Sequence, residues 1–378
     1  MIEIEEIHLE AGKYFLLSER IIGYDIARAL AVFGMVMVNF KTVMGAAGNG
    51  PDWLVTAAGL LDGRAAATFV VLAGAGISLL TRQGYMQDDH DLLVQNRRTL
   101  LKRAFFLFVI GLLYTPVWPA DILHFYGVYI ALAAFLLATS SRRLWVYTCS
   151  LVLTFAVMLL VFDYEKFWDW NTLTYERFWT IEGMVRHLFF NGFHPVLPWL
   201  AFLLLGMILG RQDMRLPAVQ RRIFVWGVAA AIAAEFISGL LVRTLLSAAI
   251  PLEKATIIAL VGTGPMPPMP LYMLAGAGTA CAVIAASIAI GQRYDESFWI
   301  RPLVAAGQLA LTLYVGHVVV GLGLLEVLGY LGNQTLQFAV LTSILFCMAG
   351  VTFAYFWQKW FARGPLESLL RTLTGMGK

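Results

Sequence analysis

The sequence has few charged residues. Aspartate, glutamate, lysine and arginine make up 13% of its 378 residues, about half of the roughly 25% found in soluble domains. The net charge is only +3, so the chain lacks the basic surface of a nucleic-acid-binding protein. The composition therefore argues against an ordinary soluble enzyme and against a nucleic-acid partner.

The sequence also lacks several marks of familiar sites. Its three cysteines, Cys149, Cys281 and Cys347, lie in apolar stretches without paired spacing, which indicates neither a disulfide framework nor a metal site. No nucleophile elbow, phosphate-binding loop or dinucleotide fingerprint stands out. The first 20 residues do not combine a basic segment with a following apolar one, so we expect no cleavable signal peptide.

Long apolar stretches are abundant instead. Hydrophobic residues make up 60% of the chain, and several runs reach the roughly 20 residues that cross a bilayer. Eleven tryptophans and fourteen tyrosines suit anchors at two membrane interfaces. We predict an all-α polytopic integral membrane helix bundle, with residues 1–378 forming one transmembrane domain of about ten helices. The expected helices are 22–44, 65–82, 100–118, 120–138, 143–163, 194–210, 222–247, 268–291, 302–328 and 335–361. Segments 51–62 and 172–190 are too polar to span and are expected at an interface.

The basic residues indicate how the chain is oriented. They gather in the even-numbered connections and after the last helix: Arg82, Arg97, Arg98, Lys102 and Arg103; Arg142 and Arg143; Arg211, Arg215, Arg221 and Arg222; Arg293 and Arg301; Lys359, Arg363, Arg371 and Lys378. Connections 114–121 and 329–334 contain neither lysine nor arginine. Because cytoplasmic loops are rich in these residues, both termini are predicted to be cytoplasmic. The expected location is a bacterial cytoplasmic (inner) membrane, crossed several times.

Polar residues follow one face of the first predicted helix. Asp25 and Arg28 are three residues apart and can pair, and Arg28 and Asn39 are separated by nearly whole turns. Ionisable residues within spans usually face a bundle interior or a cavity. Two interpretations remain open: the wall of a polar conduit, or a structural ion pair with one interhelical amide.

The ninth predicted helix carries a second polar group. Gln308, Tyr314 and His317 lie in the segment GQLALTLYVGH, with Gly321 one turn further on. A neutral histidine with an orienting partner can act as a general base. The alternative is a hydrogen bond that holds two helices together.

Two further histidines and one charged pair lie in predicted spans. His124 and His194 are expected in the non-cytoplasmic half, where each alone is more often structural than catalytic. Glu235 and Arg243 are eight residues apart on the seventh helix. They are expected to neutralise each other or other buried partners.

Five blocks of the sequence resemble a known family. They are RIIGYDIARALAVFGMVMVNF (20–40), GRAAATFVVLAGAGISLL (63–80), GFHPVLPWLAFLLLGMILGR (192–211), GQLALTLYVGH (307–317) and GPLESLLRTLT (364–374). In this order they resemble YeiB-like bacterial membrane proteins, which are related to heparan-α-glucosaminide N-acetyltransferase. The resemblance implies a transmembrane acyltransferase that takes acetyl from cytosolic acetyl-CoA.

Only one of the two residues implicated in the family's chemistry has a match in this sequence. In the lysosomal relative, an asparagine of the first-helix block and a histidine about eleven residues later are implicated in the chemistry. Asn39 matches that asparagine, but Gly50 stands at the second position and no histidine lies between Asn39 and Asp62. Either another histidine serves, with His317 the first choice, or the protein has another activity. If His317 serves, we expect it on the wall of the same cavity as Asn39, in the half nearer the outer surface.

We therefore expect a membrane acyltransferase, with a transporter of a small organic or amphiphilic solute as the alternative. A structural scaffold explains the buried polar residues least well. The expected catalytic residues are His317, Asn39 and Tyr314, and the expected substrate-binding residues are Asp25, Arg28, His124, His194 and Gln308. Acyl-CoA (acetyl-CoA) is the expected donor, and no metal is expected. The expected partners are membrane lipid and an acceptor that is an envelope glycan or a lipid-linked sugar, and a homodimer is left open.

Overall fold

The protein is an all-α membrane bundle with one short β-hairpin. The computed structural model describes residues 20–170, 172–248 and 251–374. The helices in the first half are α2 (Gly23–Val43), α3 (Asp52–Gly59), α4 (Arg64–Met86), α5 (His90–Tyr114), α6 (Leu123–Ala133), α7 (Ser141–Val161) and α8 (Ile181–Arg186). Those in the second half are α9 (Val196–Gly210), α10 (Pro217–Ser247), α11 (Lys254–Val261), α12 (Pro270–Arg293), α13 (Ile300–Gln308), α14 (Ala310–Gly316), α15 (Gly323–Val327), α16 (Leu336–Trp357) and α17 (Pro365–Leu373).

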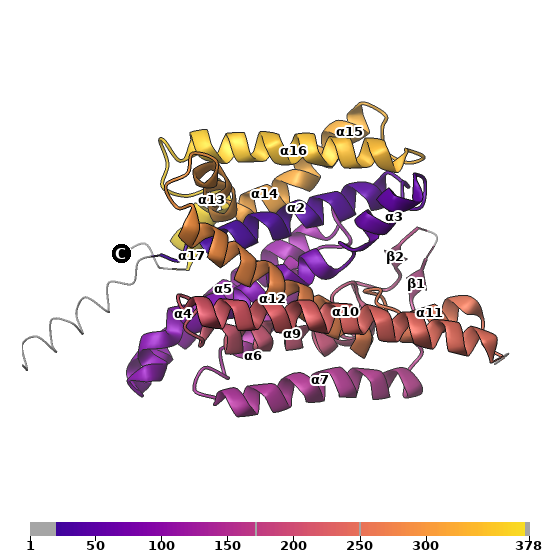
Figure 1. Ribbon diagram of the computed structural model, residues 1–378, viewed down its shortest axis with the longest axis horizontal. Helices are drawn as coiled ribbons and strands as arrows, with labels where there is room; N and C mark the ends of the chain where they lie inside the picture. Colours follow the sequence, from indigo (N-terminus) through magenta and orange to yellow (C-terminus); the bar gives the residue numbers. More distant parts are fainter. Residues whose placement is uncertain (1–19, 171, 249–250, 375–378) are drawn as a thin grey trace, which may run out of the picture.

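The long helices run side by side, with α16 and α7 on opposite sides of the bundle (Figure 1). The short helices α3 and α11 lie at one end, together with the β-hairpin. Helices α13 and α17 lie at the other end. We call the first the hairpin end and the second the α17 end.

The chain is a multi-pass membrane protein. Among the described residues, seven helices are long and apolar enough to cross a bilayer, or eight if the bent pair Ile181–Asn191 and Val196–Gly210 counts as one span. Helix α6 has only 11 residues, and α5 carries several basic residues in its first half. At least one helix overlaps each of the ten expected ranges, although several begin or end outside them, and the number of spans stays a prediction.

Glycines allow the central helices to pack closely. A Cβ atom on Gly74 of α4 would lie 1.9 Å from the carbonyl oxygen of Leu203 on α9. A Cβ on Gly206 of α9 would lie 2.0 Å from the carbonyl oxygen of Val71 on α4. Such distances admit only glycine, which is the usual device for close helix pairs in membranes. These contacts fix α4 and α9 against each other in the centre of the bundle.

The expected helix 302–328 is divided into shorter pieces. The backbone leaves the helical region at Leu309 (φ −103°, ψ 25°), and a π-helical turn, His317–Leu322, separates α14 from α15. The carboxylate of Glu367 accepts hydrogen bonds from the amides of Leu311 (2.8 Å) and Thr312 (3.1 Å) after the break. It also accepts a hydrogen bond from the hydroxyl of Thr312 at 2.5 Å. Helix α17 thus supplies partners for the backbone groups freed by the break.

The connection between α7 and α9 has its own structure. Strand β1 (Trp168–Asp169) pairs with antiparallel β2 (Thr174–Tyr175), and the π-helical turn His187–Asn191 follows α8. Asn191 is fully buried, donates to the carbonyl of Tyr164 at 2.8 Å and accepts from the hydroxyl of Tyr175 at 2.8 Å. Burial raises the pKa of the Tyr175 phenol to about 12, so it is a neutral donor at physiological pH. These bonds hold the hairpin over the bundle.

Candidate functional site

A cavity of about 690 Å³ lies at the hairpin end of the bundle. Its wall combines the second half of α2, the start of α4, the segment before α6 and the hairpin connection. The polar and aromatic lining residues are Asn39, Lys41, Thr42, Asp62, Trp118, Thr172, Phe193, His194, Trp199 and Tyr314. We call it the Asn39 cavity. Its volume lies within the usual range for small-molecule sites, about 300–1,000 Å³.

The two leading candidates of the sequence meet at this cavity. The side-chain amide nitrogen of Asn39 lies 2.8 Å from Nε2 of His317, and Nδ1 of His317 contacts the carbonyl oxygen of Tyr314. If Nδ1 carries the proton and donates to that carbonyl, Nε2 keeps its lone pair and accepts from Asn39. The contacts therefore fit a neutral imidazole whose basic nitrogen points at the cavity wall.

His317 does not itself line the cavity. Its side chain is fully buried, and it lies behind Asn39, one hydrogen bond from the wall. We expected it on the wall itself. The ring lies inside the bundle instead, where it is held between the Tyr314 carbonyl and the Asn39 amide. A Cβ on Gly321 would meet the rings of Phe40 and Phe346, so that glycine makes room for aromatic side chains rather than for a ligand.

Tyr314 joins the same wall to the segment before α6. Its hydroxyl accepts a hydrogen bond from the backbone amide of Ile122 at 3.2 Å. The Trp118 ring contacts His317 edge-on, with 6.3 Å between ring centroids. Tyr314 and Trp118 both line the cavity, so aromatic side chains surround the contact between Asn39 and His317.

An ion pair that the sequence reading did not single out also lies in the cavity. Lys41 Nζ is 2.5 Å from Asp62 Oδ1, and the lysine side chain is 8% exposed. Lys41 follows Asn39 by two residues, and Asp62 directly precedes Gly63, the N-cap residue of α4. The signal in the sequence was a lone charge at the edge of each of two apolar stretches, NFK and LLDG.

His124 and His194 belong to a histidine cluster next to the cavity. Nδ1 of His124 lies 3.0 Å from Oδ2 of Asp121, and its ring stacks on that of His187 at 5.8 Å. His194 lines the cavity and lies against Phe125, whose ring also contacts His187. The sequence reading missed Asp121 and His187. The seven-residue spacing of His187 and His194 was the available signal.

Several buried polar atoms of the histidine cluster have no hydrogen-bond partner within the described part of the chain. They are Asp121 Oδ1, His124 Nε2, His187 Nδ1 and His194 Nδ1. Buried polar atoms of this kind are usually satisfied by ordered water. Over the described ranges, no three histidine, cysteine or acidic side chains are placed to hold a metal ion.

The remaining candidates lie toward the α17 end. Arg28 pairs with Asp25 at 2.6 Å and approaches the carbonyl of Gly307 at 3.4 Å. Gln308 accepts a hydrogen bond from Gln358 at 2.8 Å. Fourteen residues of α2 separate Asp25 from Asn39, which is about 21 Å along the helix. The structure therefore divides the expected polar stripe into two separate groups.

Two family models match the chain. The model described as heparan-alpha-glucosaminide N-acetyltransferase, catalytic, matches residues 20–236, and the model described as protein of unknown function (DUF418) matches residues 211–377. No curated protein matches the chain. Asn39 lies in the first matched region and His317 in the second, so the contact between them joins the two.

Proposed function

The chain belongs to the YeiB-like family related to heparan-alpha-glucosaminide N-acetyltransferase, and from this premise we propose that it is a membrane acyltransferase. It would move an acyl group, acetyl in the first place, from cytosolic acyl-CoA to a hydroxyl or amine. The acceptor would be an envelope glycan or a lipid-linked sugar.

The observation that carries the proposal is the contact between Asn39 and His317. Acyl transfer needs a base for the attacking group and a hydrogen-bond donor for the oxyanion that forms. An imidazole nitrogen and a primary amide 2.8 Å apart are suited to these two tasks. Asn39 lines a cavity large enough for a sugar, and His317 lies directly behind it.

The proposed reaction starts when an acceptor enters the Asn39 cavity. Its hydroxyl or amine replaces the Asn39 amide as the partner of His317 Nε2, which takes the proton as the nucleophile attacks the thioester carbonyl. The new C–O or C–N bond forms, the C–S bond breaks, and the departing CoA thiolate takes the proton from His317. The products are an ester or amide and free CoA, and no net proton is gained or lost when the acceptor is neutral.

Asn39 changes partners during this sequence. Once the acceptor has displaced it from His317, its amide is free to donate to the thioester oxygen. Tyr314 lines the same cavity, and its hydroxyl is the second proposed donor. One preorganised donor of this kind is worth about 10²–10³ in rate.

The lining of the cavity suits a sugar. Trp118 and Trp199 offer indole rings, and Lys41 and Asp62 offer charged partners for hydroxyl or amino groups. Wide apolar faces with a few placed polar groups are typical of sites that orient small polar ligands. At the α17 end, basic residues such as Arg20 and Arg28 would attract the phosphates of the donor.

The proposal is tested with purified protein, acetyl-CoA labelled in its acetyl group, and a set of amino sugars and lipid-linked sugars. The expected result is release of free CoA that depends on the acceptor, with the label appearing in the acceptor. If no acceptor supports turnover, and the protein in liposomes moves a solute across the bilayer, the transporter interpretation replaces this one.

The orientation of the bundle is tested separately. Single cysteines at Trp170 and Arg98, introduced after replacing Cys149, Cys281 and Cys347, are treated in intact spheroplasts with a reagent that does not cross membranes. We expect labelling at 170 and none at 98, because the positive-inside rule places the second connection in the cytoplasm. Labelling at both positions would overturn the predicted topology.

A further inference from the structure

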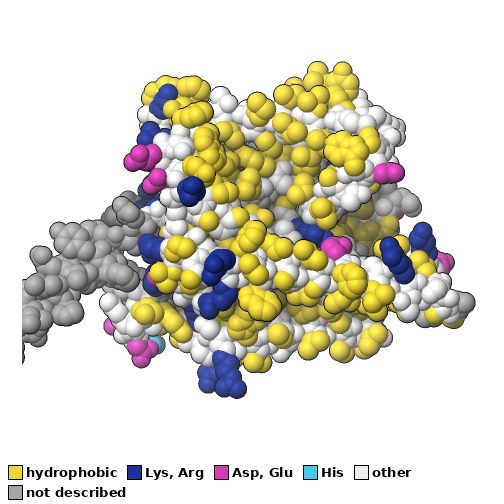
Figure 2. Space-filling model, viewed as in Figure 1, with side chains coloured by type: hydrophobic (Ala, Val, Ile, Leu, Met, Phe, Trp, Pro, Cys, Tyr) yellow, Lys and Arg dark blue, Asp and Glu magenta, His cyan; other side chains and the backbone are white. Residues whose placement is uncertain are grey.

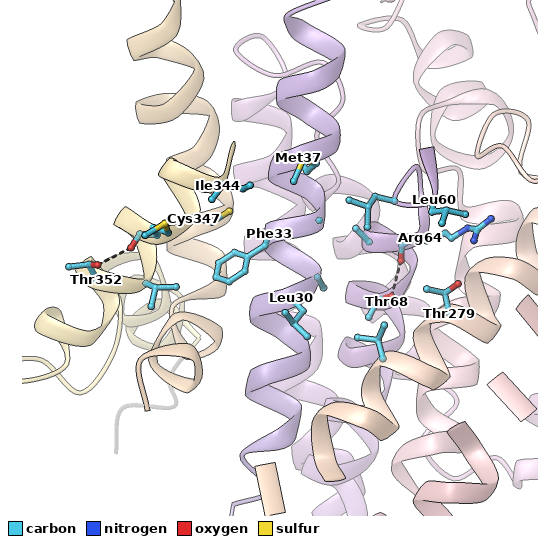
Figure 3. Close-up of a pocket in the computed structure, with 17 residues that line it drawn as sticks. Leu30, Phe33, Met37, Leu60, Arg64, Thr68, Thr279, Ile344, Cys347 and Thr352 are labelled. Atoms are coloured by element: carbon cyan, nitrogen blue, oxygen red, sulfur yellow. Dashed lines mark hydrogen bonds between the residues drawn. The ribbon is translucent and has the colours of Figure 1, made fainter. Parts of the chain in front are cut away.

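An apolar groove runs along the membrane-facing side of α2. It has a volume of about 680 Å³ and lies between α16 on one side and α4 and α12 on the other (Figure 3). Its lining includes Phe33, Met37, Leu60, Ile344 and Met348. The surrounding face of the molecule is covered mainly by hydrophobic side chains (Figure 2). We call this feature the lateral groove.

The lateral groove and the Asn39 cavity share part of one wall. Leu61 and Ala65 line both. Next to them, Gly34 packs so closely on α4 that a Cβ would lie 2.6 Å from the Cβ of Ala65. The partition between groove and cavity is therefore about one side chain thick. The other large apolar groove, along α7 and α10, has a volume of about 720 Å³ and shares no described lining residue with the Asn39 cavity.

A charged side chain lies within the lateral groove. Arg64, the first residue of α4, lines it, and its side chain is only 9% exposed. Its guanidinium contacts the carboxylate of Glu235 on α10. Glu235 thus pairs with another helix rather than with Arg243 of its own helix. Nε of Arg64 is buried and has no partner among the described residues.

A charged arginine in this position is unfavourable in free energy unless its guanidinium binds a partner. Ionisable residues within spans mark functional sites because moving a charge into hydrocarbon is unfavourable. Glu235 occupies one nitrogen of the guanidinium fork, and Nε still has an unused donor. The guanidinium fork matches the geometry of a phosphate. An apolar groove that contains such a donor suits a ligand with a hydrocarbon chain and a phosphate.

We propose that the lateral groove holds the hydrocarbon chain of a lipid-linked acceptor. The phosphate of this lipid contacts Arg64, and its sugar passes the partition at Leu61 and Ala65 to reach Asn39 and His317. This inference rests on the proposed acyl transfer and selects, from its two acceptor classes, the lipid-linked one. The lipid reaches the site sideways from the bilayer, so its chain never leaves an apolar environment.

The first experiment measures lipid binding in nanodiscs. The probes are a fluorescent long-chain polyisoprenyl phosphate and the corresponding polyisoprenol, which lacks the phosphate. Ile344→Trp fills the groove from α16, and Leu341→Trp is the matched control. Both positions are about half exposed on the same helix, at 45% and 53%, but only Ile344 lines the groove. We expect Ile344→Trp to weaken binding of both probes several-fold, because the indole fills the space of the hydrocarbon chain, which then loses its packing contacts with the groove.

A second variant separates the phosphate from the chain. Arg64→Gln/Glu235→Gln removes both members of the ion pair, so no lone charge stays in the membrane. We expect this double variant to bind the phosphate probe about ten- to a hundredfold more weakly, which is the usual contribution of a hydrogen bond to a charged group. Binding of polyisoprenol should not change. Equal affinities of wild type and both variants for the phosphate probe would overturn the proposal.

The final measurement compares acyl transfer to a lipid-linked sugar and to the same sugar without its lipid. Support consists of a loss of transfer to the lipid-linked sugar in Ile344→Trp, with transfer to the free sugar unchanged. If Ile344→Trp leaves transfer to both acceptors unchanged, the proposed role of the groove is overturned, whereas the proposed acyltransferase activity is not. If the wild type acylates neither acceptor, the acceptor role of the lipid is overturned together with the proposed function. The two failures can be told apart, because lipid binding in the groove would still be weakened by the substitutions at Ile344 and Arg64.

Discussion

His317 and His124 are both buried in the same bundle, yet their surroundings differ. His124 has a carboxylate partner, Asp121 Oδ2, at 3.0 Å, and its second ring nitrogen has no partner among the described residues. His317 has a backbone carbonyl and the Asn39 amide as partners. Neither Asp121 nor His124 lines the Asn39 cavity, whereas Asn39 and Tyr314 do.

The difference shows that a carboxylate partner is not sufficient for a histidine to act as the general base. A carboxylate that orients a histidine is the arrangement used by hydrolytic triads, and on partners alone His124 is the better candidate. A base must also come within hydrogen-bond reach of the reacting group. His317 is one side chain from the cavity, and His124 is packed between Phe125 and His187. Position therefore favours His317 as the base and His124 as a structural residue.

Exchanging each histidine for glutamine gives the largest expected effect. His317→Gln keeps polarity and approximate size, and acyl transfer should fall by about 10²–10⁴, the usual contribution of a general base. His124→Gln should leave the rate per folded molecule nearly unchanged. Rates are measured on protein that elutes as a single species with unchanged helical circular dichroism. The opposite pattern would make His124 the base.

Removal of the Asn39 amide is expected to have the next largest effect. Asn39→Ala should lower kcat by about 10²–10³, since one oxyanion donor is lost. Thr42→Val is the matched control, because Thr42 lines the same cavity while its hydroxyl bonds to Val38 of its own helix at 2.8 Å. If both variants lose activity equally, the shape of the cavity matters and the donor does not.

Loss of the His124 partner should affect stability rather than catalysis. Asp121→Leu removes the acceptor of the His124 backbone amide and ring nitrogen, at a cost of about 1–3 kcal/mol for buried groups left unpaired. Asp121→Asn keeps an acceptor oxygen and should cost less. The apparent melting temperature in detergent is the measurement. A tenfold or greater loss of acyl transfer in well-folded Asp121→Asn would contradict a purely structural role.

The smallest expected effect comes from Tyr175, at the edge of the histidine cluster. Tyr175→Phe keeps the ring contact with His187 but loses the hydrogen bond to Asn191. We expect a loss of about 0.5–1.5 kcal/mol in stability and an unchanged rate of acyl transfer. Slower transfer with unchanged stability would link the hairpin to catalysis.

Local spacing predicted the parts of the site that lie on one helix. The pairing of Asp25 with Arg28 follows from their three-residue separation, and the structure contains it. The contact between Asn39 and His317 joins residues 278 positions apart. The sequence placed both in the half toward one membrane surface. The absence of the expected first-loop histidine also suggested that His317 shares a cavity with Asn39. The direct contact between them was not predicted, because helical periodicity describes one helix at a time.

The residues that sequence reasoning missed share a physical cause. Asp62 and Arg64 lie at the boundary between a short helix and a span, where a charge is normally assigned to a loop. In the structure this turn packs against α12, where the hydroxyl of Tyr272 donates to the carbonyl of Gly63 at 3.0 Å. The partners of these charges, Lys41 and Glu235, come from other helices. Such partners are set by tertiary packing.

The hydrogen bonds from α14 to Glu367 have a consequence for biogenesis. Helix α14 carries Tyr314 and leads into the turn that begins with His317, and its first free amides are satisfied by a carboxylate some fifty residues later in the chain. Because a chain is synthesised from its N-terminus, Glu367 is translated some fifty residues after α14. A nascent chain that ends before residue 367 therefore lacks the carboxylate that satisfies the first amides of the helix leading to His317.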